Sequence, residues 1–283
     1  MGELLPTVAA RTVQEGLLDY LDTTFALSDP DARAALRAFL AHPDHGVFKG
    51  PYIRLRLPFR PADEGWRDLL GWHPLDDGAG FAPYRHQAAA FARLSTLDQT
   101  RPRPTIVTTG TGSGKTEAFL YPILDHVLRA KARGDDGVKA LIVYPMNALA
   151  NDQALRLARL ICDLPSLRSV TAGIYTGETE ERRTIVTPDG LINDRAVLRD
   201  SPPDILLTNY KMLDQLLLRA EDARIWSQSA RSLQYLVLDE FHTYDGAQGT
   251  DVAMLLRRLG LTLKAYGAAG ERPLAHVTPV ATS

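Results

Sequence analysis

The residues with the clearest chemical potential are "TGTGSGKTE" at positions 109–117. They match the pattern G-x-x-x-x-G-K-[ST], in which the backbone N–H groups of a glycine-rich turn surround phosphate groups. The pattern follows an apolar run and opens a helical stretch, so the N-terminus of a helix adds a favourable dipole for anions. The loop consists of Gly110, Thr111, Gly112, Ser113, Gly114, Lys115 and Thr116. The alternative, a flexible Gly-Ser turn, fits this context poorly.

A second motif, "DEFH" at 239–242, directly follows the apolar run "YLVL". In a nucleotide site Lys115 neutralises the β- and γ-phosphates of ATP, and the Thr116 hydroxyl ligates Mg²⁺. Such a site also needs carboxylates, and we expect Asp239 to hold Mg²⁺ and Glu240 to orient and deprotonate the attacking water. The pair alone could equally be a solvated acidic loop; the phosphate-binding pattern upstream favours the catalytic interpretation. The sequence therefore predicts ATP and Mg²⁺ as cofactors.

Positioning these motifs requires a particular fold. From residue 81 onward, short apolar runs alternate with helical stretches. The runs are 105–109, 140–144, 172–176, 204–209, 235–240 and 275–283. Near-continuous apolar runs suit strands that are buried on both faces, and their alternation with helices predicts an α/β fold with a mainly parallel sheet flanked by helices. Parallel strands end at a common edge, which allows residues 109–117 and 239–242 to meet.

On these motifs, residues 81–283 resemble the first RecA-like motor domain of superfamily 2 DEAD/DEAH-box helicases, of the DExH type. The segment "YRHQ" at 84–87 resembles the upstream motif that recognises adenine. The resemblance implies that Gln87 reads the adenine edge and that Tyr84 or Arg85 lines the base. Gln87 could otherwise be an ordinary residue of a surface helix.

Three weaker segments resemble the family's nucleic-acid contacts: "YPMNALANDQ" (144–153), "YTGET" (175–179) and "LLTNYKML" (206–213). The resemblance implies contacts to the nucleic-acid backbone from Pro145, Asn147, Thr176, Gly177, Thr208 and Asn209. Hydroxyl, amide and backbone groups suit phosphate contacts without base readout. Each segment also has a structural interpretation, as a turn, a strand end or, for Asn147, the N-cap of a helix at 148–161.

Coupling between the nucleotide and the rest of the motor is expected at His242, Thr282 and Ser283. His242 stands where RNA-specific DEAD proteins have Asp, and its alternative is a structural histidine at a strand end. The family's Ser-Ala-Thr motif either corresponds to the variant Ala281-Thr282-Ser283 or begins at Ser283, and we favour the second alignment. In both cases we expect the second RecA-like domain, which would supply an arginine finger, to be absent from this chain.

Residues 1–80 predict a mainly helical accessory segment, which a Gly/Pro/Asp-rich linker joins to residues 81–283. Ser28 or Asp29 is a plausible N-cap before Pro30, and "GPYIRLRLPF" (50–59) predicts an extended segment. The net charge is −2, with 8 Lys+Arg and 12 Asp+Glu in residues 1–80, so the chain is not globally basic. A nearly neutral domain can still bind nucleic acid through local phosphate contacts.

The chain has one cysteine, Cys162, no apolar run near the length of about 20 residues that a membrane helix needs, and no signal-peptide pattern at its start. A cytoplasmic protein without membrane contact is therefore expected. The family resemblance and His242 favour DNA over RNA. A narrower resemblance, to very long bacterial helicases of which some belong to anti-phage defence, adds defence-complex proteins as possible partners.

Three functions are open at this point. The first is an ATP-dependent nucleic-acid helicase or translocase, whose isolated first domain binds ATP weakly and hydrolyses it slowly. The second is a nucleotide-gated docking or DNA-binding module that is inactive alone, with residues 1–80 contacting a partner. The third is a duplex translocase of the restriction type, which shares the same core.

Overall fold

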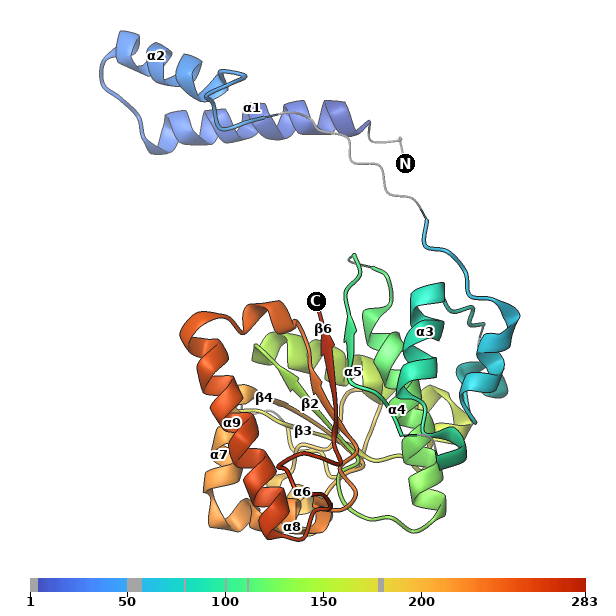
Figure 1. Cartoon of the computed structure of the whole chain (residues 1–283). Coiled ribbons are helices and arrows are strands. Elements are labelled where there is room, and N and C mark those ends of the chain that lie inside the picture. The colour runs from blue at the N-terminus through green and yellow to red at the C-terminus, as the bar shows by residue number, and fades with distance from the viewer. Residues whose placement is uncertain (1–4, 50–57, 79, 100, 111, 178–180) are drawn as a thin grey trace. The chain divides into compact units, whose positions relative to one another are not determined.

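The computed structural model of the 283-residue chain describes residues 5–49, 58–78, 80–99, 101–110, 112–177 and 181–283. The chain divides into two compact units, residues 1–58 and 59–283. Both are drawn in Figure 1. None of the helices in the described ranges has the length and hydrophobicity of a membrane-spanning segment.

The first unit contains two helices, α1 (Pro6–Thr24) and α2 (Pro30–Ala41). The predicted cap before Pro30 is confirmed as Asp29, whose carboxylate accepts the N–H groups of Asp31 and Ala32 at 3.3 Å. Arg37 joins the two helices by an ion pair to Asp19 at 2.8 Å. The extended segment predicted at 50–59 lies almost entirely outside the described residues.

The second unit is built on a six-stranded sheet of order β1-β6-β5-β2-β4-β3, in which every neighbouring pair is parallel. This confirms the predicted α/β class and all six predicted strands. The strands are β1 (Thr105–Val107), β2 (Ala140–Tyr144), β3 (Ala172–Tyr175), β4 (Ile205–Asn209), β5 (Tyr235–Leu238) and β6 (Thr278–Thr282).

Helices cover both faces of the sheet, and the alternation of side chains along β2 shows how. Ile142 and Tyr144 pack into one hydrophobic core with α3, α4 and α5, whereas Leu141 and Val143 pack into a second core with α6 to α9. The helices are α3 (Arg85–Leu94), α4 (Lys115–Ala132), α5 (Asn147–Asp163), α6 (Arg195–Asp200), α7 (Tyr210–Leu218), α8 (Ala223–Ser229) and α9 (Gly246–Ala265). Figure 1 shows these layers around the sheet.

The segment 59–80 belongs to the sheet-containing unit, so the division of the chain lies after Pro58 and not at the expected 80/81. Trp66 and Trp72 are buried in the core that includes α3 and α4. Backbone hydrogen bonds of 2.9 Å from Ala62 to Pro83 and 2.8 Å from Arg85 to Arg60 fix the segment beside α3. Its short 3₁₀ turns are η1 (Glu64–Leu69) and η2 (Pro74–Asp77). These packed aromatic residues outweigh the linker-like composition around residue 80.

One buried histidine gives the fold a pH dependence. Burial, followed by the charges of Arg129 and Arg133, lowers the pKa of His126 from 6.5 to about 4. A neutral histidine with a depressed pKa contributes fully to the free energy of unfolding above pH 6.5, and this contribution is lost as the pH falls toward 4. The loss is on the order of 2 kcal/mol between pH 6.5 and 5. Urea titrations at both pH values should detect the loss. His126→Gln should remove most of this slope, whereas His242→Gln, at a side chain that is 58% exposed, should retain it.

Candidate nucleotide site and nucleic-acid edge

The glycine-rich loop connects the end of β1 to the first turn of α4, which begins at Lys115. Gly112 and Gly114 both have φ of +74°, a left-handed conformation that favours glycine. Inside the loop, the hydroxyls of Thr109 and Ser113 lie 2.5 Å apart. Thr111 lies outside the described residues. The curled backbone and the helix N-terminus are the elements that a phosphate-binding loop requires.

Side chains of α3 hold the glycine-rich loop in place through hydrogen bonds. The Gln87 side-chain amide donates to the Gly114 carbonyl at 2.9 Å, and its oxygen accepts the Tyr84 N–H at 2.8 Å. His86 Nε2 lies 2.9 Å from the Ser113 carbonyl oxygen. A Cβ on Gly114 would lie 2.2 Å from Gln87 Nε2. Gln87 is therefore a buried residue that holds the loop in place through hydrogen bonds. The family resemblance, which assigned Gln87 to adenine recognition, did not predict this role.

The two other residues of the expected adenine motif differ in exposure. Tyr84 is half-buried and stacks on His86 with ring centroids 5.8 Å apart. The ring centroid of Phe59 lies 5.2 Å from that of Tyr84. Arg85 is exposed. The sequence did not predict that His86 and Phe59 lie beside Tyr84 at this site. His86 could have been proposed, because it directly precedes Gln87 in the sequence.

The acidic pair meets the loop at the carboxyl edge of the sheet. Asp239 and Glu240 follow β5 directly, and β6 separates β5 from β1. Lys115 Nζ lies 3.9 Å from Glu240 Oε1. Glu240 itself has a left-handed φ of +48°, which is unusual for a residue other than glycine, asparagine or aspartate. The fold thus brings together Lys115 and Glu240, which are far apart in the sequence.

Thr282, at the end of β6, connects the two carboxylate residues. Its hydroxyl donates to Asp239 Oδ1 and accepts the Glu240 N–H at 3.1 Å. Burial raises the pKa of the Asp239 carboxyl, and the hydrogen bond from Thr282 opposes that shift only in part. An acid with a raised pKa costs stability once it is ionised at neutral pH, so a bound cation would relieve this cost.

The residues expected to couple the nucleotide to the rest of the motor also lie near one another. His242 Nδ1 is 3.3 Å from Ser283 Oγ and 3.4 Å from Glu240 Oε2. Phe241 is 42% exposed and its ring centroid lies 6.4 Å from that of Tyr244. Thr282 and Ser283 therefore contact different members of "DEFH", and these contacts are compatible with both alignments of the Ser-Ala-Thr motif.

Thr282→Val tests the importance of the bridge from β6. The substitution keeps the shape of the side chain but leaves Asp239 Oδ1 and the Glu240 N–H without this partner. We expect hydrolysis of ATP to fall about tenfold, the equivalent of one lost hydrogen bond, with little change in nucleotide affinity. Thr278→Val, on the same strand but bonded to Gln234 at 3.2 Å, is the control. Equal loss of hydrolysis in both variants would contradict the assignment.

The residues expected to contact nucleic acid lie at the carboxyl ends of β2, β3 and β4. Asn209 caps α7 by accepting the Met212 N–H at 2.7 Å, and its amide donates to Asn147 Oδ1. The expectation that Asn147 is an N-cap is wrong, because α5 begins at Asn147 itself and Met146 is the residue before it. The side chain of Asn147 instead joins the ends of β2 and β4.

The other members of this set differ in accessibility. Thr208 is completely buried, and its hydroxyl donates to the Tyr175 carbonyl at 2.7 Å. This burial does not fit a direct nucleic-acid contact by the Thr208 side chain. Pro145 and Thr176 are half-buried and Gly177 is exposed, whereas Glu178 and Thr179 lie outside the described residues.

Comparison with known proteins decides the family. Residues 84–270 match the model of the DEAD/DEAH box helicase family. The chain belongs to this family. As a DEAD/DEAH box protein it is 26% identical to the Druantia protein DruE of Escherichia coli (strain UMEA 4076-1), over 88% of this chain and 19% of DruE. It is also 33% identical to the uncharacterized ATP-dependent helicase MJ1574 of Methanocaldococcus jannaschii, over 67% of this chain and 25% of MJ1574.

A solved structure with a similar fold is the DUF1998 helicase MrfA. It is 25% identical to this family member with a TM-score of 0.55, over 78% of this chain and 29% of MrfA. The predicted RecA-like class is confirmed by this similarity. The chain spans only 19% to 29% of the lengths of these three relatives.

Proposed function

We propose that this chain is the ATP-binding part of an ATP-dependent nucleic-acid helicase or translocase that acts on DNA. The convergence of Lys115 and Glu240 at 3.9 Å carries the proposal. It brings a phosphate-neutralising ammonium group and a candidate proton acceptor to one edge of the sheet, beside the glycine-rich loop. Family membership and the ATP-dependent activity named for MJ1574 support the same function.

The residues present suit ATP with Mg²⁺. The loop residues Gly110 to Thr116 would surround the phosphates, with the Thr116 hydroxyl and Asp239 holding the metal. Hydroxyl and carboxylate oxygens suit Mg²⁺, and Asp239 Oδ2 is the carboxylate oxygen that does not receive the Thr282 hydroxyl. Bound Mg²⁺ supplies charge neutralisation at the phosphates. Glu240 would orient and deprotonate water. Tyr84 and Arg85 would line the adenine base, and Gln87, whose amide donates to the Gly114 carbonyl, would support the phosphate-binding loop.

For nucleic acid, we propose the edge formed by Pro145, Thr176 and Gly177, next to the buried side chain of Asn209, which Asn147 holds in place. Thr208 would act indirectly, by holding the carbonyl before Thr176. The crystal structure of MrfA bound to DNA and AMPPNP has a similar fold over 80% of this chain, with a TM-score of 0.54. DNA is preferred over RNA on the basis of His242 and the family resemblance.

The proposal is tested by measuring ATP hydrolysis by the full-length protein, with and without single-stranded DNA and duplex DNA. We expect DNA to stimulate hydrolysis. Lys115→Ala should weaken ATP binding and reduce hydrolysis by at least about 100-fold, since the lysine contacts the phosphates in both the bound and transition states. Arg133→Ala, which removes an exposed ion pair with Asp135, is a charge-matched control. Unchanged hydrolysis in Lys115→Ala would exclude this nucleotide site.

A second candidate function is a docking module in the first unit, residues 1–58, that acts separately from residues 59–283. Among the described residues of α1 and α2, only Leu18 is buried, while Val13, Tyr20 and Phe39 are each at least 60% exposed. Exposed apolar side chains on a helical pair favour contact with another protein. Equal capture of a partner with and without residues 1–58 would exclude this role. The similarity to DruE makes defence proteins the first partners to test, in a cytoplasmic setting.

A further inference from the structure

A polar pocket lies at the amino edge of the sheet, where β1, β6 and β5 begin. Its volume is about 670 Å³, a size typical of sites for small molecules. The stretch before β1 contributes Arg101, α4 and its C-cap contribute His126, Arg129 and Arg133, and the stretch before β6 contributes His276. The proposed nucleotide site lies at the opposite, carboxyl edge, so this pocket is separate from it.

The pocket is positively charged. The described residues of its lining include three arginines and neither aspartate nor glutamate. Arg129 pairs with Asp125 at 2.7 Å, and Arg133 pairs with Asp135 at 2.8 Å. Arg101 forms no ion pair with any carboxylate in the described part of the chain. Because an arginine in a protein stays protonated, one positive charge of the pocket is left for an anionic ligand to compensate.

Two of these arginines have hydrogen-bond donors that the protein does not use. A guanidinium carries five N–H donors on three nitrogens. Arg101 uses only Nη2, which donates to the Ala275 carbonyl at 2.6 Å. Arg133 uses Nε and Nη2, which both donate to Asp135. Among the described residues, Nη1 of Arg101 and Nη1 of Arg133 have no acceptor. Both side chains are exposed, so a ligand can reach these donors.

The segment before β6 gives the pocket a preformed wall. Gly270 has φ of +99°, and a Cβ on it would lie 2.6 Å from Ala275 Cβ. Leu274 has φ of +60°, a conformation that is uncommon for residues other than glycine and that occurs often at ligand sites. The bond from Arg101 to Ala275 joins this wall to the stretch before β1. A pocket that is shaped in advance loses little conformational freedom when a ligand binds.

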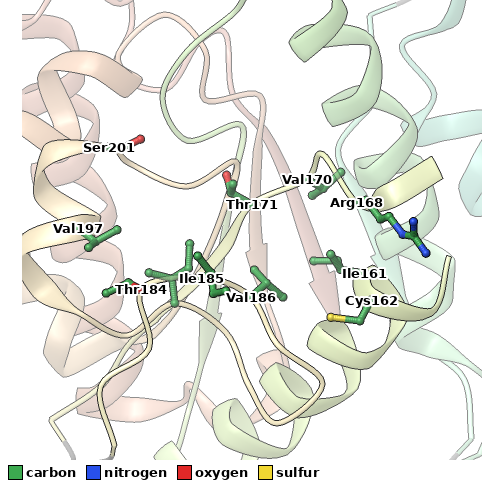
Figure 2. A pocket seen from close by; sticks show the side chains of 11 residues that line it. Ile161, Cys162, Arg168, Val170, Thr171, Thr184, Ile185, Val186, Val197 and Ser201 are labelled. Carbon is green, nitrogen blue, oxygen red and sulfur yellow. The ribbon is translucent and has the colours of Figure 1, made fainter. Parts of the chain in front are cut away.

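A cavity beside β3 differs from the polar pocket in its chemistry (Figure 2). Its volume is about 490 Å³, and its described lining is mainly aliphatic with one arginine, Arg168. Figure 2 shows the guanidinium of Arg168 turned away from Ile185 and Val186. The Thr171 hydroxyl is already bonded to Asp204 at 2.8 Å. This cavity offers an anion no pair of guanidinium groups, and Arg168 therefore provides a matched control.

We propose that the pocket at the amino edge binds a phosphate-bearing small molecule, whose phosphate oxygens accept hydrogen bonds from Arg101 and Arg133. Arginine is suited to phosphate because its N–H groups bind several phosphate oxygens at once. A tetrahedral phosphate accepts donors from two separate segments of the chain, whereas a planar carboxylate matches a single guanidinium. The nucleic-acid backbone is a less suitable source of phosphate, because the edge proposed for it lies at the other ends of the strands. For the same reason, Arg133→Ala still serves as the control for ATP hydrolysis.

Histidine ring signals in NMR spectra of this chain can locate the binding of inorganic phosphate. His126 and His276 line the pocket, whereas His86 lies 2.9 Å from the Ser113 carbonyl oxygen and reports on the glycine-rich loop. Titration with phosphate at constant pH and ionic strength should shift the His126 and His276 signals until they saturate. Absence of a saturable shift, or an equal response to acetate, overturns the proposal. A response to single-stranded DNA but not to phosphate overturns it as well and assigns the pocket to nucleic acid.

The same titration separates this proposal from the proposed function. If only the His86 signal shifts, phosphate binds in the glycine-rich loop and the pocket is refuted. If only the His126 and His276 signals shift, the pocket is retained and the proposed nucleotide site loses its support.

Two substitutions test the contacts. Arg101→Gln and Arg133→Gln should each weaken phosphate binding in the pocket at least about tenfold, the loss expected for one hydrogen bond to a charged group. Arg168→Gln removes an exposed arginine from the lining of the cavity in Figure 2 and should leave this affinity unchanged. Thermal melting checks the folding of each variant, and Arg133→Gln disrupts only an exposed ion pair. Unchanged phosphate affinity in Arg133→Gln, or an equal loss in Arg168→Gln, overturns the proposal.

Discussion

Glu240→Gln is expected to reduce ATP hydrolysis by about 10²–10⁴-fold, the range associated with loss of a general base, with ATP binding largely retained. Glutamine preserves the size of the side chain and the backbone N–H that Thr282 accepts, but its amide cannot take a proton from water. Removal of the negative charge beside Lys115 also leaves the ammonium free for phosphate. The substitution therefore separates the chemical step from binding.

Single-turnover hydrolysis and equilibrium binding of a non-hydrolysable ATP analogue measure the two quantities independently. Asp251→Asn is the matched control, because it removes an exposed carboxylate from α9 and should change neither. Loss of analogue binding in Glu240→Gln would mean that the carboxylate holds the loop in shape. Normal hydrolysis would mean that another group activates the water.

The strands and the phosphate loop could be predicted because their signals are local. β2 and β4 are each five consecutive buried residues, and such runs are visible in the sequence. The meeting of Lys115 with Glu240 also followed from local signals, since parallel strands share their carboxyl edge. Knowledge of the exact strand order was not needed for that inference.

Side-chain partners far away in the sequence could not be predicted in this way. The Gln87 amide is bound to Gly114, and the Asn147 side chain to Asn209; nothing local to Gln87 or Asn147 indicates these partners. The burial of Thr208 depends on which face of β4 it occupies. A strand that is buried on both faces lacks the polar alternation that would reveal this.

The division after Pro58 was missed for a related reason. Composition near residue 80 is typical of a linker, whereas the packing of Trp66 and Trp72 against the core depends on contacts with α3 and α4. Composition describes the chain alone, and tertiary contacts decided which unit contains these residues.

The amino edge of the sheet, opposite the proposed nucleotide site, depends on one buried carboxylate. Asp204 accepts hydrogen bonds from Lys139 at 2.9 Å, from Lys131 at 2.8 Å and from the Thr171 backbone at 2.7 Å. Burial opposes ionisation of Asp204, but the bonds from Lys131, Thr171 and Lys139 outweigh it and lower its pKa. The cluster joins the starts of β2, β3 and β4 to the end of α4.

Asp204→Ala is expected to lower the free energy of unfolding by about 3–5 kcal/mol, because it leaves the buried ammonium of Lys139 without compensation. Lys131 can reach solvent, since its side chain is 30% exposed, whereas that of Lys139 is only 3% exposed. Urea unfolding of the chain gives the measurement. Asp200→Ala is the control: its pair with Arg224 is exposed and should contribute no more than about 1 kcal/mol.

A double variant separates charge burial from general damage to the strand. Removing both partners of a buried ion pair costs less than removing one, because no buried charge remains uncompensated. Asp204→Ala combined with Lys139→Met should therefore be more stable than Asp204→Ala alone. If the second substitution instead adds to the loss, the cluster acts through packing and not through charge.

The same variants bear on function, because β2 and β4 carry Pro145 and Asn209 at their other ends. If the proposed nucleic-acid edge is correct, loss of this common anchor should weaken DNA binding before the sheet unfolds.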